Sequence, residues 1–66
     1  MKLKELLPLL CNNYEVSRIN EDRSYKKKEI PSDMLDDTVI CIYADSEYNE
    51  HYEEVGIIYI ETKKGR

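Results

Sequence analysis

The sequence predicts an α+β fold, in which a short N-terminal helix packs on a small, mostly antiparallel sheet of three to four strands. Leucines recur with a helical spacing in the first ten residues, and β-branched, apolar runs occupy 38–44 and 56–61. Two shorter stretches with strand character, 14–19 and 24–29, lie between the leucine-rich start and the run 38–44. Because 66 residues support only one small core, we expect a single domain, residues 1–66, in the order helix, strand, strand, helical turn, strand, strand.

The first element is predicted to be an amphipathic helix. Its leucines follow the i, i+3, i+4, i+7 rule and would face the core: Leu3, Leu6, Leu7 and Leu10. Pro8 lies beyond the first turn, where proline clashes with a preceding carbonyl, so we expect the helix to be short or bent. Asn12 and Asn13 suit its end, because asparagine tolerates the left-handed conformation.

Two strands joined by the polar turn 20–23 are expected next. The alternation in 14–19 is imperfect, which favours an edge strand or a bulge near Arg18. The strand 24–29 carries consecutive lysines at 26–28, which would discourage aggregation between sheet edges. The polypeptide then reaches a predicted single turn of helix.

This helical turn is expected over 30–36. Pro31 suits its first position, and Asp33 suits the positive end of its dipole. Met34 and Leu35 would point inward.

The clearest strand, 38–44, is apolar on both faces, so we expect it at the centre of the sheet with the helix on one side. Its other face would need a cover, and a homodimer is the simplest source of one. In the final strand, Tyr59 would form a cross-strand pair with Tyr43. The segment 45–54 has no aliphatic side chain and is expected to be a long hairpin tip or loop. The aliphatic residues of the two strands are expected in the core: Val39, Ile40, Ile42, Ile58 and Ile60.

The two cysteines, Cys11 and Cys41, are too few for a disulfide scaffold. Each lies in an apolar stretch, so we expect buried, reduced thiols. No segment approaches the roughly 20 apolar residues of a membrane span, and the leucine-rich start does not match an export signal. These observations predict a cytoplasmic protein that does not bind membranes.

Charge is distributed unevenly along the chain. Residues 1–28 hold seven Lys and Arg and four acids, whereas residues 29–62 hold ten acids and neither Lys nor Arg. An acidic half of this kind would repel the phosphates of nucleic acids and membranes.

The acidic segment 45–54 is the main candidate site. Its carboxylates are interleaved with tyrosines, which supply rigid contact area, so it could recognise a basic surface of another protein. A solvated hairpin that only maintains solubility is the alternative. Together with nearby aspartates, the candidate partner-binding residues are Asp33, Asp36, Asp37, Asp45, Glu47, Tyr48, Glu50, Tyr52, Glu53 and Glu54.

Catalysis, cofactors and metals are not expected. The chain has two glycines, too few for a phosphate-binding loop, and its size argues against a deep pocket of several hundred Å³. His51 is the only histidine and cannot form a zinc site without both distant cysteines. The acidic loop lacks the glycine usual in calcium loops. The sequence therefore indicates a non-enzymatic protein.

A basic stretch provides the alternative function. Its aromatic residue could stack on single-stranded bases in a small nucleic-acid-binding dimer. The residues of this alternative site are Arg23, Tyr25, Lys26, Lys27 and Lys28. A structural or assembly protein of a phage particle is a further alternative.

The leucine-rich opening, the Tyr14-Glu15-Val16 strand, the 30–36 motif Ile-Pro-x-x-Met-Leu-Asp and the closing Ile-Ile-x-Ile strand together resemble small acidic accessory proteins of bacteriophages and mobile elements. The resemblance implies a short protein of the bacterial host cytosol. Some members of that class block host defence nucleases such as CRISPR effectors. Together with the charge pattern, it suggests an inhibitor that imitates nucleic acid and occupies a basic surface of its partner.

Overall fold

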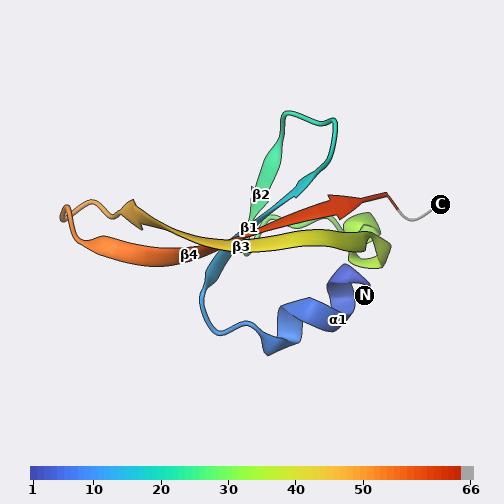
Figure 1. The fold of residues 1–66 in the computed structure, drawn as a ribbon, viewed down its shortest axis with the longest axis horizontal. Helices are drawn as coiled ribbons and strands as arrows, with labels where there is room; N and C mark the ends of the chain where they lie inside the picture. Colours follow the sequence, from blue (N-terminus) through green and yellow to red (C-terminus); the bar gives the residue numbers. More distant parts are fainter. Residues whose placement is uncertain (65–66) are drawn as a thin grey trace.

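The computed structural model describes residues 1–64, which form one short helix, two 3₁₀ turns and four strands (Figure 1). The chain folds in the predicted order, and the α+β class is confirmed. The elements are α1 (Leu3–Leu6), η1 (Leu7–Leu9), β1 (Asn13–Arg18), β2 (Ser24–Lys26), η2 (Ser32–Asp36), β3 (Thr38–Tyr48) and β4 (Glu54–Lys63).

Pro8 explains why the helix is so short. Its missing N–H and its ring are incompatible with a continuing α-helix, and the chain tightens into η1 after Leu6. The Lys2 N–H, which has no backbone partner within the helix, donates to Glu5 Oε1 at 2.7 Å. α1 is consequently a single turn that covers only part of the sheet.

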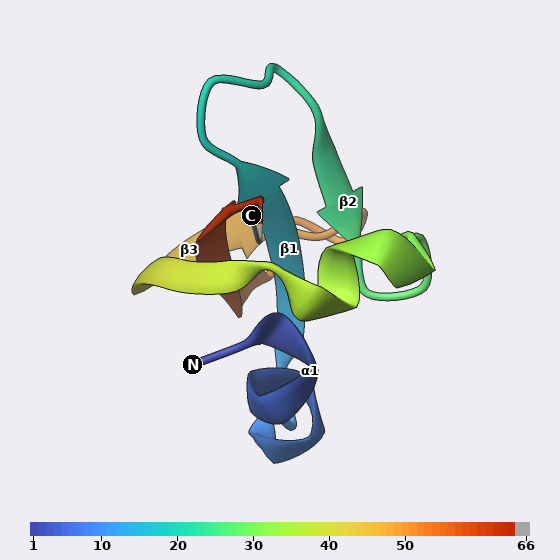
Figure 2. The same ribbon diagram turned by 90° about the vertical axis from the view of Figure 1, so that its right-hand side faces the viewer.

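The four strands form one mixed sheet in the order β2-β1-β4-β3. β2 pairs with β1, and β3 with β4, in antiparallel fashion, whereas β1 and β4 run parallel. In the parallel pair, Tyr14 lies opposite Ile58 and Val16 opposite Ile60. Figure 2 shows α1 and the η2 turn on the same side of β1. The sheet is therefore mostly antiparallel, as predicted.

The core lies between one face of β1 and β4 and the covering segments α1, η1 and η2. Met34 from η2 and Leu3 from α1 are fully buried at its centre. The buried members of the cluster are Leu3, Leu6, Tyr14, Val16, Met34 and Ile60. The opposite face of the sheet carries no helix in the described part of the chain, although Ile57 is buried there.

The expected positions of two strands were wrong. β3 was predicted to be central but lies at the edge of the sheet, while β1, a candidate edge strand, lies between β2 and β4. The single-turn helix is too short to cover β3. Ile40 and Ile42, expected in the core, are consequently about half exposed, at 49% and 48%. The bulge lies in β3, between Val39 and Cys41, and not near Arg18.

The cysteines also differ from expectation, because both Cys11 and Cys41 are exposed. Cys11 lies in the connection between η1 and β1, and Cys41 lies on the uncovered edge strand. The predicted pair of Tyr43 and Tyr59 is confirmed, with ring centroids 5.4 Å apart and the rings stacked. None of the helices in residues 1–64 has the length and hydrophobicity needed to cross a membrane.

Candidate protein-binding hairpin

The acidic segment 45–54, called the acidic hairpin below, consists of the end of β3, a five-residue loop and the start of β4. Of the two expected forms, a long hairpin tip or a loop, it takes the first, because β3 continues to Tyr48 and β4 resumes at Glu54. Figure 1 shows it projecting away from α1, along the long axis of a molecule that measures 41 × 25 × 19 Å. Its exposed acids and tyrosines are Asp45, Glu47, Tyr48, Glu50, Tyr52, Glu53 and Glu54.

Asn49 closes the loop through both its backbone and its side chain. Its N–H donates to the Glu53 carbonyl at 3.0 Å, and its carbonyl accepts from the Tyr52 N–H at 3.0 Å. Its side-chain Oδ1 accepts from the N–H groups of His51 and Glu53, at 2.8 and 3.0 Å. Asparagine is suited to this role because its short amide can bond to backbone groups a few residues ahead. The loop therefore has a defined conformation that fixes where its acids and tyrosines lie.

Tyr52 has a left-handed backbone, with φ of 60°. This conformation crowds the Cβ atom and costs roughly 1–2 kcal/mol for a residue other than glycine. The Tyr52 side chain is also 88% exposed, so it gains little from packing within the chain. A large aromatic ring is thus held at the tip of a projecting hairpin, at a position where glycine would be more stable.

The carboxylates of the acidic hairpin form no ion pair with Lys or Arg anywhere in residues 1–64. Glu54 accepts a hydrogen bond from Ser46 Oγ at 2.8 Å, and Glu53 accepts one from Asn49 Nδ2 at 3.2 Å. The Glu50 carboxylate lies 3.8 Å from His51 Nε2. The negative charge of this surface is consequently available to a partner.

Asp45 and Glu47 project from the same face of β3, because side chains two residues apart share a face. Tyr59 lies on that face of the neighbouring strand. Partial burial raises the pKa of the Tyr59 phenol, and the charges of Glu15, Glu47 and Asp45 raise it further. The phenol therefore stays neutral at physiological pH and can act only as a hydrogen-bonding or stacking group.

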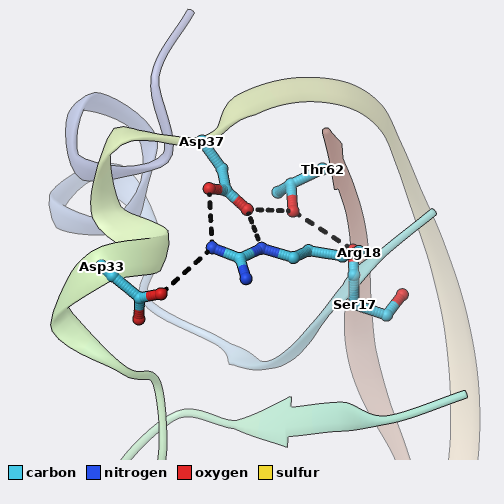
Figure 3. Close-up of polar contacts among 5 residues, drawn as sticks. All are labelled: Ser17, Arg18, Asp33, Asp37 and Thr62. Carbon is cyan, nitrogen blue, oxygen red and sulfur yellow. Dashed lines mark hydrogen bonds and ion pairs between the residues drawn. The ribbon is translucent and has the colours of Figure 1, made fainter. Parts of the chain in front are cut away.

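The three predicted site residues around η2 lie far from the acidic hairpin and have cationic neighbours. Asp37 is only 1% exposed, so its inclusion in a binding surface was wrong. It accepts hydrogen bonds from Arg18 Nε at 2.7 Å and Arg18 Nη2 at 3.1 Å, and Thr62 Oγ1 donates to it at 3.0 Å (Figure 3). These contacts raise the pKa of the Arg18 guanidinium, chiefly through the hydrogen bond to Asp37. Arg18 and Asp37 thus form part of the structural framework.

Asp33 and Asp36 are exposed but paired. Asp33 Oδ2 lies 3.5 Å from Arg18 Nη2, and Asp36 Oδ1 lies 3.0 Å from Lys4 Nζ. The hydrogen bond from Lys4 lowers the pKa of the Asp36 carboxyl. Lys4 therefore offsets the charge of Asp36, whereas Asp33 shares the single charge of Arg18 with Asp37.

The basic stretch, residues 23–28, is also engaged within the chain. The Arg23 guanidinium carbon lies 4.9 Å from the centre of the Tyr25 ring, and Lys27 Nζ lies 5.7 Å from the centre of the Tyr14 ring. Tyr14 is buried and Tyr25 is partly buried against the core, which leaves neither ring fully exposed for stacking on bases. This arrangement does not favour the single-strand-binding alternative.

A hollow of about 420 Å³ lies beside this stretch, on the face of the sheet away from α1. The surface of the protein is therefore more hollowed than we predicted from the length of the chain. Most of the lining side chains are exposed, and the hollow is a surface groove. Its ionisable lining residues are Lys26, Lys27, Lys28, Glu15, Glu29 and Glu47. Three cations and three anions leave it without a dominant charge.

Within residues 1–64, no three His, Cys, Asp or Glu side chains are grouped so as to hold a metal ion. No family model, curated protein or solved structure was found to match the chain. The geometry of the acidic hairpin is therefore the main basis for a functional proposal. The signal in the sequence was the cluster of acids and tyrosines in 45–54, whereas the roles of Asn49 and of the Tyr52 backbone were missed. Asn49 alone among the tip residues is a strong turn former and could have been found on that ground.

Proposed function

We propose that this protein is a non-enzymatic interaction module that binds a basic surface of a nucleic-acid enzyme through its acidic hairpin. The observation that carries the proposal is Tyr52, which is 88% exposed and held in a left-handed conformation among carboxylates that have no Lys or Arg partner within residues 1–64. Backbone strain of this kind persists where it serves a function, and exposed tyrosines are common anchors in protein interfaces.

The mechanism is charge mimicry. Five carboxylates lie within ten residues of a hairpin whose two strands are about 5 Å apart, which concentrates negative charge on a narrow ridge. A DNA duplex also presents dense negative charge, about one phosphate per 1.7 Å of its axis. A groove that binds nucleic acid would attract this ridge, and Tyr48 and Tyr52 would add contact area that phosphates lack.

The identity of the partner is also part of the proposal. The resemblance to accessory proteins of bacteriophages and mobile elements supports a host defence nuclease, such as a CRISPR effector, in the bacterial cytosol. Occupation of its nucleic-acid groove would block the enzyme without any chemistry by this chain.

Affinity capture from bacterial lysate, with identification by mass spectrometry, tests the proposal. The test variant carries Glu47→Gln and Glu50→Gln, and the control variant carries Glu21→Gln and Asp22→Asn, so each loses two exposed acids. We expect the wild type and the control to retain a nucleic-acid enzyme that the test variant loses.

Competition then tests mimicry with the purified partner. We expect its nucleic acid to displace this protein, and we expect the complex to weaken as salt concentration rises. An enzyme that binds this protein and its nucleic acid simultaneously, or with an affinity independent of salt, would contradict mimicry.

A further inference from the structure

The outer edge of β3 is open over residues 40–48, all of which are exposed. The N-terminal residues cover the start of this edge. The Val39 N–H donates to the Met1 carbonyl at 2.8 Å, the Leu3 N–H donates to the Asp37 carbonyl at 2.9 Å, and Lys2 forms an isolated bridge with Thr38. After that cover, no described residue pairs with the outer side of β3.

This edge is only weakly protected against strand pairing, because its bulge lies at its start, between Val39 and Cys41, and its charged side chains, Asp45 and Glu47, lie toward its other end. Residues 40–48 contain no lysine and no proline, and three large apolar side chains on the strand are about half exposed: Ile40, Ile42 and Tyr43. An exposed edge strand offers a row of unpaired N–H and C=O groups to another strand. The other sheet edge, β2, spans only three residues and ends at a lysine.

We propose that two copies of this chain associate through antiparallel pairing of their β3 edges about a two-fold axis at Tyr43. The paired residues are 40–46 of each copy. Tyr43 then lies opposite Tyr43, Ile42 opposite Ala44 and Ile40 opposite Ser46, so each large aliphatic side chain meets a small one. Because each Tyr43 already stacks on Tyr59, the tyrosines form one continuous row across the dimer.

Charge selects this arrangement. Parallel pairing in register would place Asp45 beside Asp45 and Glu47 beside Glu47, which is unfavourable. The antiparallel arrangement separates the two acidic ends and brings each Glu47 toward the Val39 end of the other copy, where the exposed Lys2 lies. In this arrangement each copy offers the other a small side chain opposite each isoleucine and Lys2 near Glu47. We therefore propose a second copy of this chain as the occupant of the edge.

The dimer closes because each copy has one long open edge, and the result is a continuous eight-stranded sheet. A strand pair with few flanking side chains buries less than the ~1,200 Å² typical of stable interfaces. We therefore expect weak self-association that depends on concentration. This inference does not rest on the proposed function.

Sedimentation velocity over a micromolar to millimolar concentration series tests the proposal. We expect the wild type to form dimers as concentration rises, and we expect Tyr43→Glu to remain monomeric because it places like charges opposite each other. Leu9→Glu is the control: it makes a similar change at a side chain that is 70% exposed and belongs to η1 rather than to the sheet, and it should dimerise like the wild type. A wild type that stays monomeric throughout would overturn the proposal, as would a variant Tyr43→Glu that still dimerises.

Cysteine cross-linking provides a second test that does not depend on the folding of Tyr43→Glu. In a Cys11→Ser, Cys41→Ser background, Tyr43→Cys lies opposite its own copy and should form a disulfide-linked dimer readily. Ser46→Cys is the control, because its two copies would lie six residues apart along the strand, about 20 Å. Faster cross-linking at position 46 than at position 43 would refute this register, and capture of a foreign strand instead of a second copy would refute the choice of occupant.

Discussion

At Arg18, a single guanidinium connects three separate parts of the chain. It bonds to Asp37, which follows η2 and is 1% exposed, and it approaches Asp33 in the same turn. Asp37 in turn accepts from Thr62 of β4, and its carbonyl accepts from the Leu3 N–H of α1. The segments that cover the core are therefore fixed to the sheet through this ion pair.

We expect Arg18→Met to unfold most of the protein at 25 °C. Removal of one partner from a buried ion pair costs about 3–5 kcal/mol, and a domain of this size rarely has more stability than that. Arg18→Lys keeps the positive charge and should be less destabilising, although it loses the two-pronged geometry. Urea unfolding followed by circular dichroism measures both variants. Wild-type stability in Arg18→Met would show that the pair is unimportant.

Tyr52 allows stability and binding to be separated. We expect Tyr52→Gly to raise the free energy of unfolding by about 1 kcal/mol, because glycine relieves the left-handed strain. The same variant should bind the proposed partner at least tenfold more weakly, since it loses an exposed anchor. Tyr52→Phe keeps the ring and the strain, and serves as the control. A stabilised variant with unchanged affinity would remove Tyr52 from the binding surface.

At the level of elements, the loop of the acidic hairpin depends on Asn49. Its side-chain oxygen accepts two backbone hydrogen bonds. We expect Asn49→Ala to destabilise the protein by about 1 kcal/mol, in line with the loss of comparable side-chain caps. We also expect faster amide hydrogen exchange at His51 and Glu53, while β1 stays protected. Unchanged exchange at both residues would show that the backbone alone closes the loop.

The sequence predicted elements better than their positions in the sheet. Leucine spacing located the helix, Pro8 predicted its shortness, and β-branched runs located the long strands. Strand order could not be predicted, because the run 38–44 is as apolar as a buried strand although it lies at an edge. Contacts with the core explain the hydrophobicity of this run only in part. Its apolar side chains that stay half exposed motivate the proposal of strand pairing.

Sequence analysis likewise predicted only some of the residues of the candidate site. Composition alone located the acids and tyrosines of 45–54. The distinction between these acids and Asp37 required tertiary structure, because Arg18 is 19 residues away in sequence. A count of charges in a short stretch of sequence cannot show that a residue of another strand forms an ion pair with one of its acids.

At the scale of the whole molecule, the core and the acidic hairpin occupy different regions. The buried cluster lies where α1, η1 and η2 cover the sheet, whereas the hairpin projects beyond them (Figure 1). None of the residues of the buried cluster comes from 45–54. The chain therefore combines a stabilising part with a projecting part that contributes few core contacts.

This separation predicts that the hairpin can be shortened without loss of the fold. Ser46 lies opposite Gly56, so residues 47–55 can be replaced by Asn-Gly, which favours a two-residue hairpin turn. We expect the shortened protein to fold with a free energy of unfolding within about 1 kcal/mol of the wild type. It loses four acids, which changes the formal net charge from −4 to 0, and it should no longer bind the proposed partner.

Self-association distinguishes this outcome from general damage. The proposed β3 pairing uses residues 40–46, all of which the shortened protein retains, so it should still dimerise in sedimentation velocity, more weakly than the wild type only by the lost attraction between Glu47 and Lys2. Loss of partner binding together with retained dimerisation would assign the two activities to different parts of one strand. If the shortened protein still binds the partner, recognition lies outside the acidic hairpin, and if it unfolds, the hairpin is part of the stabilising framework.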